Sequence, residues 1–177
     1  SRGLIAHELA HQWFGNKITC GSWQDIWLNE GFATYLSGLV IEHLDGDDAF
    51  NSWKQQKVNS ITSQTYGSVY VPAQDTLTVG RIFSGRLSYN KGSMVLHMLR
   101  TKLGDDLFFE SLQNYLSTPE FAYGYATSQE FISSVETTTE IDLTEFFNDW
   151  LFNEGYPSYI AEWGQPSDEL QIILNQS

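Results

Sequence analysis

The sequence predicts a mainly α-helical domain that is followed by a short β-hairpin. Most of the chain up to residue 152 repeats apolar residues at the spacing of a helix, whereas residues 158–163 and 169–174 resemble two short strands around a turn at 164–168. The 177 residues include 41% hydrophobic and 15% aromatic residues, which is enough for a packed core. A folded domain is therefore expected over most of the chain.

The predicted helices follow one another with short breaks. The first spans residues 2–14, with Leu4, Ile5 and Leu9 at helical spacing, and ends at Gly15-Asn16. Further helices are predicted at 23–44, 47–60, 88–103, 105–116, 128–136 and 143–152, and an irregular excursion at 61–85. Natural domains seldom open one residue before a helix, and two strands form no stable sheet alone. We therefore expect the chain to begin inside an α-domain and to stop inside a β-domain.

Charge and cysteine content exclude several classes of protein. The chain has 9 Lys and Arg against 22 Asp and Glu, a formal net charge of −13. Such a surface repels phosphate backbones, so we expect no nucleic-acid partner. No apolar run reaches the roughly 18 residues of a membrane span. Because Cys20 is the only cysteine, the chain has neither an internal disulfide nor a metal site built from several cysteines.

The first predicted helix carries the pattern H-E-x-x-H at His7, Glu8 and His11. Four residues are about one helical turn, roughly 6 Å of rise, so both imidazoles lie on one face. At that separation two ring nitrogens can reach one zinc ion at about 2.0–2.1 Å. Glu8 follows the first histidine and is near enough to act on a zinc-bound water. The pattern predicts a zinc site with a neighbouring base.

A zinc site of this kind needs a third protein ligand. The pattern H-E-x-x-H-x-x-G-x-x-H is excluded because Phe14 and Lys17 occupy the positions of its glycine and its last histidine. Glu30 lies in the apolar-rich segment 27–35, where a carboxylate is rarely placed unless it is paired or ligated. Cys20, in a predicted polar turn, is the rival ligand. We expect Glu30 to be the third ligand.

Two further residues are candidates to orient the ligands, because metal-bound histidines usually donate their second N–H to a carboxylate or carbonyl. These are Asp25 and Thr34, the latter one turn from Glu30 on the same helix face. His43 and His97 lack ligand spacing, and we interpret them as ordinary helical histidines.

Two runs of sequence, His7-Glu-Leu-Ala-His-Gln-Trp-Phe-Gly-Asn16 and Trp23-Gln-Asp-Ile-Trp-Leu-Asn-Glu-Gly-Phe-Ala-Thr-Tyr35, resemble the gluzincin aminopeptidases, the family of aminopeptidase N and leukotriene hydrolase. In that family eighteen residues separate H-E-x-x-H from the glutamate ligand, the same number as between His11 and Glu30. The run Ser88-Tyr-Asn-Lys-Gly92 looks like the family's Y-x-K-G helix. Residues 146–159 look like its junction into the next β-domain.

The resemblance implies a fold and a mechanism. Residues 1–155 would be the C-terminal helical part of a thermolysin-like zinc peptidase catalytic domain, and residues 156–177 the start of a β-sandwich-like domain. One Zn²⁺ per chain would bind His7, His11 and Glu30, with Glu8 as general base. Tyr89 would stabilise the transition state. The implied activity is removal of N-terminal residues from peptide substrates.

The sequence also departs from the family. The G-x-M-E-N motif that anchors the substrate's α-amine is absent from these residues. We therefore expect the isolated chain to have little aminopeptidase activity and to self-associate through unpaired strand edges. Two alternatives are a non-catalytic binding module of the same ancestry and an epoxide hydrolase like leukotriene hydrolase. The joint presence of the zinc and catalytic residues argues against the first, and substrate panels would separate the second.

Overall fold

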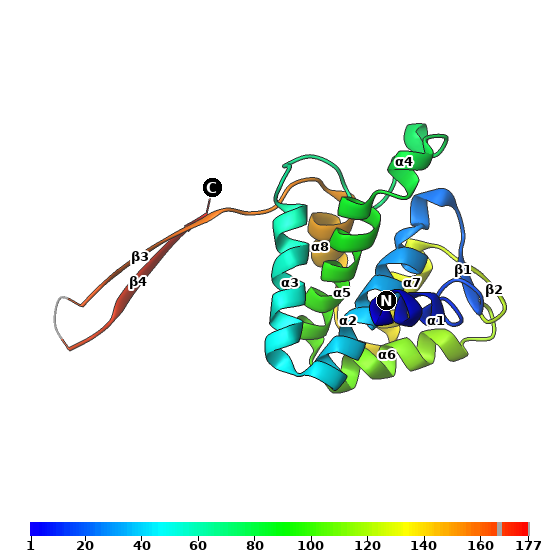
Figure 1. The fold of residues 1–177 in the computed structure, drawn as a ribbon, viewed down its shortest axis with the longest axis horizontal. Helices are drawn as coiled ribbons and strands as arrows, with labels where there is room; N and C mark the ends of the chain where they lie inside the picture. The colour runs from blue at the N-terminus through cyan, green and yellow to red at the C-terminus, as the bar shows by residue number, and fades with distance from the viewer. Residues whose placement is uncertain (166–167, 177) are drawn as a thin grey trace.

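A computed structural model, which describes residues 1–165 and 168–176, shows a helical body from which a two-stranded hairpin projects (Figure 1). The elements, in chain order, are α1 (Arg2–Ala10), β1 (Ile18–Cys20), η1 (Trp23–Asp25), α2 (Trp27–Asp45), α3 (Asp47–Ile61), η2 (Ala73–Asp75), α4 (Val79–Ile82), η3 (Gly85–Lys91), α5 (Gly92–Leu103), α6 (Asp105–Ser117), β2 (Gly124–Ala126), α7 (Ser128–Thr139), α8 (Thr144–Phe147), η4 (Asn148–Phe152), β3 (Tyr159–Gly164) and β4 (Gln171–Gln176). The predicted class, mainly α with a terminal hairpin, is confirmed.

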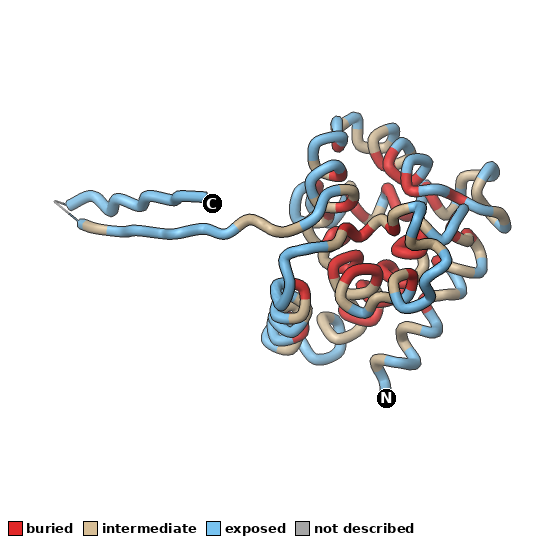
Figure 2. The backbone as a smooth tube through the Cα atoms, turned by 90° about the horizontal axis from the view of Figure 1, so that it is seen from above, coloured by how far each residue is buried: buried red, intermediate tan, exposed pale blue. Residues whose placement is uncertain are grey.

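Helix α2 forms the centre of the body, because it is apolar on nearly all sides. Trp27, Phe32 and Tyr35 are fully buried along it. Phe131 of α7 packs edge-to-face on both Trp27 and Phe32, with ring centroids 5.8 and 5.3 Å away. Figure 2 shows the buried backbone concentrated inside the helical body, whereas the hairpin is exposed. A helix whose first half is buried this completely offers a rigid support for any site built on it.

The N-terminal end of α2 is held by buried polar contacts. The carboxylate of Asp25 accepts hydrogen bonds from the backbone N–H and the hydroxyl of Ser128, at 2.8 and 2.7 Å, and from the hydroxyl of Ser22 at 2.7 Å. The indole of Trp27 donates to the Ser128 hydroxyl at 2.8 Å. Because Asp25 is only 2% exposed, removing its carboxylate would leave buried donors unpaired. The start of α7 is thereby tied to the start of α2.

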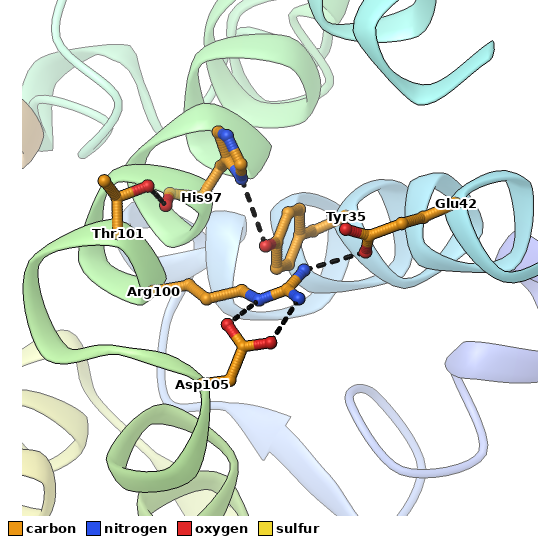
Figure 3. A network of polar contacts seen from close by, with 6 residues as sticks. All are labelled: Tyr35, Glu42, His97, Arg100, Thr101 and Asp105. Carbon is orange, nitrogen blue, oxygen red and sulfur yellow. Dashed lines mark hydrogen bonds and ion pairs between the residues drawn. The ribbon is translucent and has the colours of Figure 1, made fainter. Parts of the chain in front are cut away.

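The C-terminal half of α2 is held by an arginine side chain that bonds two carboxylates (Figure 3). The guanidinium of Arg100, on α5, donates to Glu42 of α2 at 2.8 Å and makes two bonds, of 2.8 and 2.7 Å, to Asp105 at the start of α6. Beside it, the hydroxyl of Tyr35 lies 3.3 Å from Nδ1 of His97. His97 thus takes part in helix packing, as expected for an ordinary helical histidine.

The sequence predicts one of the two strand pairs and gives no sign of the other. Strands β3 and β4 pair in antiparallel register from Tyr159 opposite Gln176 to Gly164 opposite Gln171, close to the predicted ranges. The predicted turn at 164–168 includes residues 166–167, which lie outside the described residues. Strands β1 and β2, joined in parallel with Cys20 opposite Ala126, were not predicted. Each has only three residues, so no alternating pattern is long enough to see.

One expectation for the first helix is wrong. Helix α1 ends at Ala10 rather than at residue 14, because the chain continues in tight turns such as the bond from Gln12 N–H to the Leu9 carbonyl. Its start is capped, since the N–H of Leu4 donates to the hydroxyl of Ser1. Leu4, Ile5 and Leu9, the apolar residues of the predicted pattern, remain 58%, 69% and 57% exposed.

None of the helices in the described ranges combines the length and apolarity that a membrane crossing requires.

Candidate metal centre

The site forms where α1 meets the first turn of α2. His7 and His11 lie one turn apart; His11 follows the last residue of α1 but keeps helical dihedral angles, φ −60° and ψ −16°, so that its ring stays on the face of His7. Glu30 lies in the first turn of α2, where the buried helix aims its carboxylate at both histidines. All three side chains are largely shielded, at 15%, 20% and 12% exposure. The structure therefore brings the predicted ligand set together.

The three donor atoms lie close to one another. Nε2 of His7 is 3.2 Å from both Glu30 Oε2 and Nε2 of His11, and Nε2 of His11 is 3.4 Å from Glu30 Oε2. Two ligands at about 2.05 Å from a tetrahedral ion are about 3.4 Å apart. Among residues 1–165 and 168–176, these are the His, Cys, Asp and Glu donors gathered tightly enough to hold a metal ion.

The hydrogen bond of His11 to the backbone shows which of its ring nitrogens is free to bind a metal ion. Its Nδ1 lies 3.0 Å from the carbonyl of Phe14, and a carbonyl only accepts, so Nδ1 carries the proton. In the neutral ring Nε2 then presents a lone pair to Nε2 of His7 and to the Glu30 carboxylate. Facing lone pairs repel unless a proton or a metal cation lies between them. The donor set therefore fits a borderline-soft cation such as Zn²⁺.

The carboxylate and the imidazoles shift one another's pKa through the hydrogen bonds that join them. The hydrogen bond to Glu30 is the main cause that raises the pKa of His11, against the opposing effect of burial. Burial alone would raise the pKa of Glu30, but hydrogen bonds from His11 and His7 outweigh it and lower that pKa to about 2. Glu30 is thus an anion at neutral pH, as a ligand must be.

Glycine at position 15 makes room for the orientation of His11. A Cβ at Gly15 would lie 3.2 Å from Nδ1 of His11, and the backbone there has φ +141°, which favours glycine. The sequence predicts Gly15 only as a helix stop and gives no sign of the contact with the Phe14 carbonyl. A backbone acceptor leaves no residue-type signal, so sequence reasoning had no means to find it.

The predicted outer-shell candidates do not contact the histidines. Asp25 binds Ser22 and Ser128, as described above, and in the described part of the chain neither histidine is hydrogen-bonded to Asp25 or Thr34. The role expected of a carboxylate is taken for His11 by the Phe14 carbonyl. Both expectations are therefore corrected, because the fold turns Asp25 toward α7.

The rival ligand, Cys20, lies apart from the three donors. It is buried in strand β1, where its backbone N–H donates to the side chain of Asn29 at 3.1 Å. Burial, followed by the charge of Asp25, raises the pKa of its thiol to about 11. A thiol in this environment stays protonated at neutral pH.

Tyr89 and Glu8 complete the surroundings of the three donors. Tyr89 lies in η3, a π-helical turn in which its N–H donates to the carbonyl of Ser84 five residues earlier. Its ring stacks on that of His7, with centroids 5.9 Å apart and planes 12° apart. Burial and the nearby charge of Glu30 raise the pKa of the Tyr89 phenol to about 12. Glu8 is exposed, and its charge acts on both His11 and Tyr89.

Comparison with solved structures defines the class of protein. A mutant M1 zinc metallopeptidase from Deinococcus radiodurans, bound to a Tyr-Ser-Ala substrate, matches 85% of this chain and 33% of its own, with a TM-score of 0.74 and 27% identity. Yeast LTA4 hydrolase in complex with bestatin matches 88% of this chain and 27% of its own, with a TM-score of 0.74 and 28% identity. The helical body thus has the fold of part of a zinc-metallopeptidase catalytic domain.

The sequence comparisons give the family. Residues 2–150 match the model of the peptidase family M1 domain, and the chain belongs to this family. Aminopeptidase N of Lactobacillus delbrueckii subsp. lactis is 32% identical over 161 residues, covering 87% of this chain and 19% of the relative. The chain spans about a fifth of the length of the curated relatives that it matches.

Replacing a donor should remove zinc from the site. We expect His7→Ala and Glu30→Ala each to weaken zinc affinity by more than about 100-fold, since even outer-shell changes cost 10–100-fold. Zinc per chain, measured by mass spectrometry of the metal after gel filtration, should fall from one to near zero. His43→Ala and Glu110→Ala, two exposed positions, should keep the metal. Unchanged stoichiometry in both donor variants would exclude this ligand set.

Proposed function

We propose that this chain carries the zinc-binding and catalytic residues of an M1 aminopeptidase, which hydrolyses the N-terminal peptide bond of its substrates. The observation that carries the proposal is the convergence of His7, His11 and Glu30 within hydrogen-bonding distance of one another. Family membership and relatives named aminopeptidases support the substrate class. When bound, a zinc ion supplies Lewis acidity, which activates water and polarises the scissile carbonyl.

Glu8 is the proposed general base. It lies on α1 directly beside His7, and its exposed carboxylate is open to solvent, so that water can reach it. In the first step Glu8 accepts a proton as the water oxygen attacks the peptide carbonyl carbon. In the second step the C–N bond breaks and Glu8 returns that proton to the leaving amine nitrogen. The carboxylate is thereby regenerated in each cycle.

Tyr89 is the proposed donor to the developing oxyanion. Its raised pKa, about 12, keeps the phenol protonated at neutral pH, which a hydrogen-bond donor must be. Its ring is held against the ring of His7, so the hydroxyl belongs to the same site as the metal ligands. As charge moves onto the carbonyl oxygen of the substrate, a donor placed in advance stabilises the transition state more than the ground state.

Glu8→Gln should abolish turnover without removing zinc, because the amide cannot accept the proton from water. In the complete protein that carries these residues, we expect kcat for a fluorogenic aminoacyl-amide to fall by about 10²–10⁴. Zinc content should stay at the wild-type level, and the exposed Glu110→Gln variant should retain full activity. Near-wild-type kcat in Glu8→Gln would contradict the assignment of the base.

Tyr89→Phe should lower kcat by about 10²–10³, the usual cost of removing one oxyanion donor. The phenyl ring can keep its stacking on His7, so KM and zinc content should change little. Tyr123→Phe, which removes a hydroxyl from a side chain that is 86% exposed, is the matched control and should have no effect. If both variants turned over at the wild-type rate, Tyr89 would have no catalytic role.

A further inference from the structure

Two glycines lie in direct contact where α2 crosses the segment that carries Tyr89. A Cβ built on Gly31 would lie 3.1 and 3.2 Å from the carbonyl carbon and Cα of Gly92, and one built on Gly92 would lie 3.3 Å from Cα of Gly31. All three distances are shorter than ordinary van der Waals contact between carbons. The two backbones therefore touch at a point where neither has space for a side chain.

This crossing lies between two groups of the site. Gly31 directly follows the ligand Glu30 on α2, and Gly92 follows Tyr89 by three residues, less than one helical turn. Any increase in the distance between the two backbones at this point moves Tyr89 away from Glu30 and His7. The ligands themselves come from α1 and α2, on one side of the crossing, and are not separated by it.

The surroundings of the crossing leave few ways to absorb an added methyl group. A Cβ on Gly92 would also lie 3.5 Å from Cβ of Trp27 and 3.6 Å from a methyl of Val69, and both side chains are fully buried. On the same segment, the buried ammonium of Lys91 donates to the carbonyl of Gly155 at 3.0 Å. The buried hydroxyl of Ser88 donates to the carbonyl of Ile82 at 2.7 Å.

We propose that Gly31 and Gly92 are positioning residues that set the distance between the metal ligands and the hydroxyl of Tyr89. The proposal rests on the proposed function, in which Tyr89 donates to the oxyanion. It assigns no chemical step to either glycine. A methyl group at the crossing acts on the rate through Tyr89, and leaves binding of the metal intact.

The first test is a graded series of alanines. Gly92→Ala, the milder change, should lower kcat about threefold to tenfold, and Gly31→Ala, with two closer contacts, should lower it further. KM and zinc content should stay within about twofold of wild type. Gly85→Ala is the matched control, because it lies in the same segment with no atom within 4 Å of the new Cβ. Alanine favours helix over glycine, so weakened helix formation does not explain a loss.

The second test separates positioning from general structural damage. In a Tyr89→Phe background the oxyanion donor is already absent, so Gly92→Ala should cause no further loss of kcat. An equal fold-loss in both backgrounds, or no loss in the wild-type background, would overturn the proposal. If Tyr89→Phe alone left kcat unchanged, the proposed catalytic role of Tyr89 would fail instead.

A measurement of the separation between His7 and Tyr89 tests the proposed geometry without any measurement of turnover. Nuclear Overhauser effects between the ring protons of His7 and Tyr89 report their separation in the 177-residue chain. They should be clearly weaker in Gly92→Ala than in wild type and in Gly85→Ala. Effects of wild-type strength in Gly92→Ala would overturn the proposal. Because Gly92→Ala requires the smaller displacement, it remains informative if Gly31→Ala does not fold.

Discussion

The convergence of two imidazoles and one carboxylate on a single point is the constraint on which the rest of this structure depends. Nε2 of His7, Nε2 of His11 and the Glu30 carboxylate approach one another within 3.2–3.4 Å. Such a group is stable only when a cation is shared among its members. A shared proton meets this requirement in part. Its effect is seen in the raised pKa of His11 and the lowered pKa of Glu30. A divalent ion satisfies all three donors at once.

Holding three side chains from two helices at one point requires a rigid support, and the fold provides it mainly through α2. Asp25 and Ser128 fix the first turn of this helix to α7, beside the ligand. At the other half, Arg100 joins Glu42 to the start of α6 (Figure 3). In contrast, His7 and His11 lie on and just beyond α1, and they are positioned by contacts with Glu30 of α2 and, for His11, with the Phe14 carbonyl.

Much of the site could be predicted from the sequence because its residues are recognisable from their neighbours in the chain. His7, Glu8 and His11 share one helical turn, and Glu30 stands out as a carboxylate among apolar residues. The boundaries of α3 and α6 followed from periodicity in the same way. What could not be predicted depends on distant or backbone partners. Ser128 lies 103 residues from Asp25, and no residue type encodes the carbonyl that orients His11.

The sequence predicts the role of Tyr89 only through the family pattern. The chain has nine tyrosines, and no spacing distinguishes this one from the others. The structure shows what positions Tyr89: a π-helical turn, a stacked contact with His7 and a glycine crossing beside Glu30. Such contacts join segments about 60 to 80 residues apart, which periodicity alone cannot relate. The proposed function therefore depends on packing at one helix crossing as much as on the H-E-x-x-H motif.

The proposed zinc centre is tested most directly by X-ray absorption at the zinc edge of the purified, zinc-loaded protein. Two imidazole rings and further oxygen donors, all at about 2.0–2.2 Å, are the predicted first shell. His11→Ala should remove one of the two imidazole signals. A sulfur scatterer at about 2.3 Å would place Cys20 on the metal. That result, or a spectrum without imidazole, would contradict the ligand set on which the proposed mechanism depends.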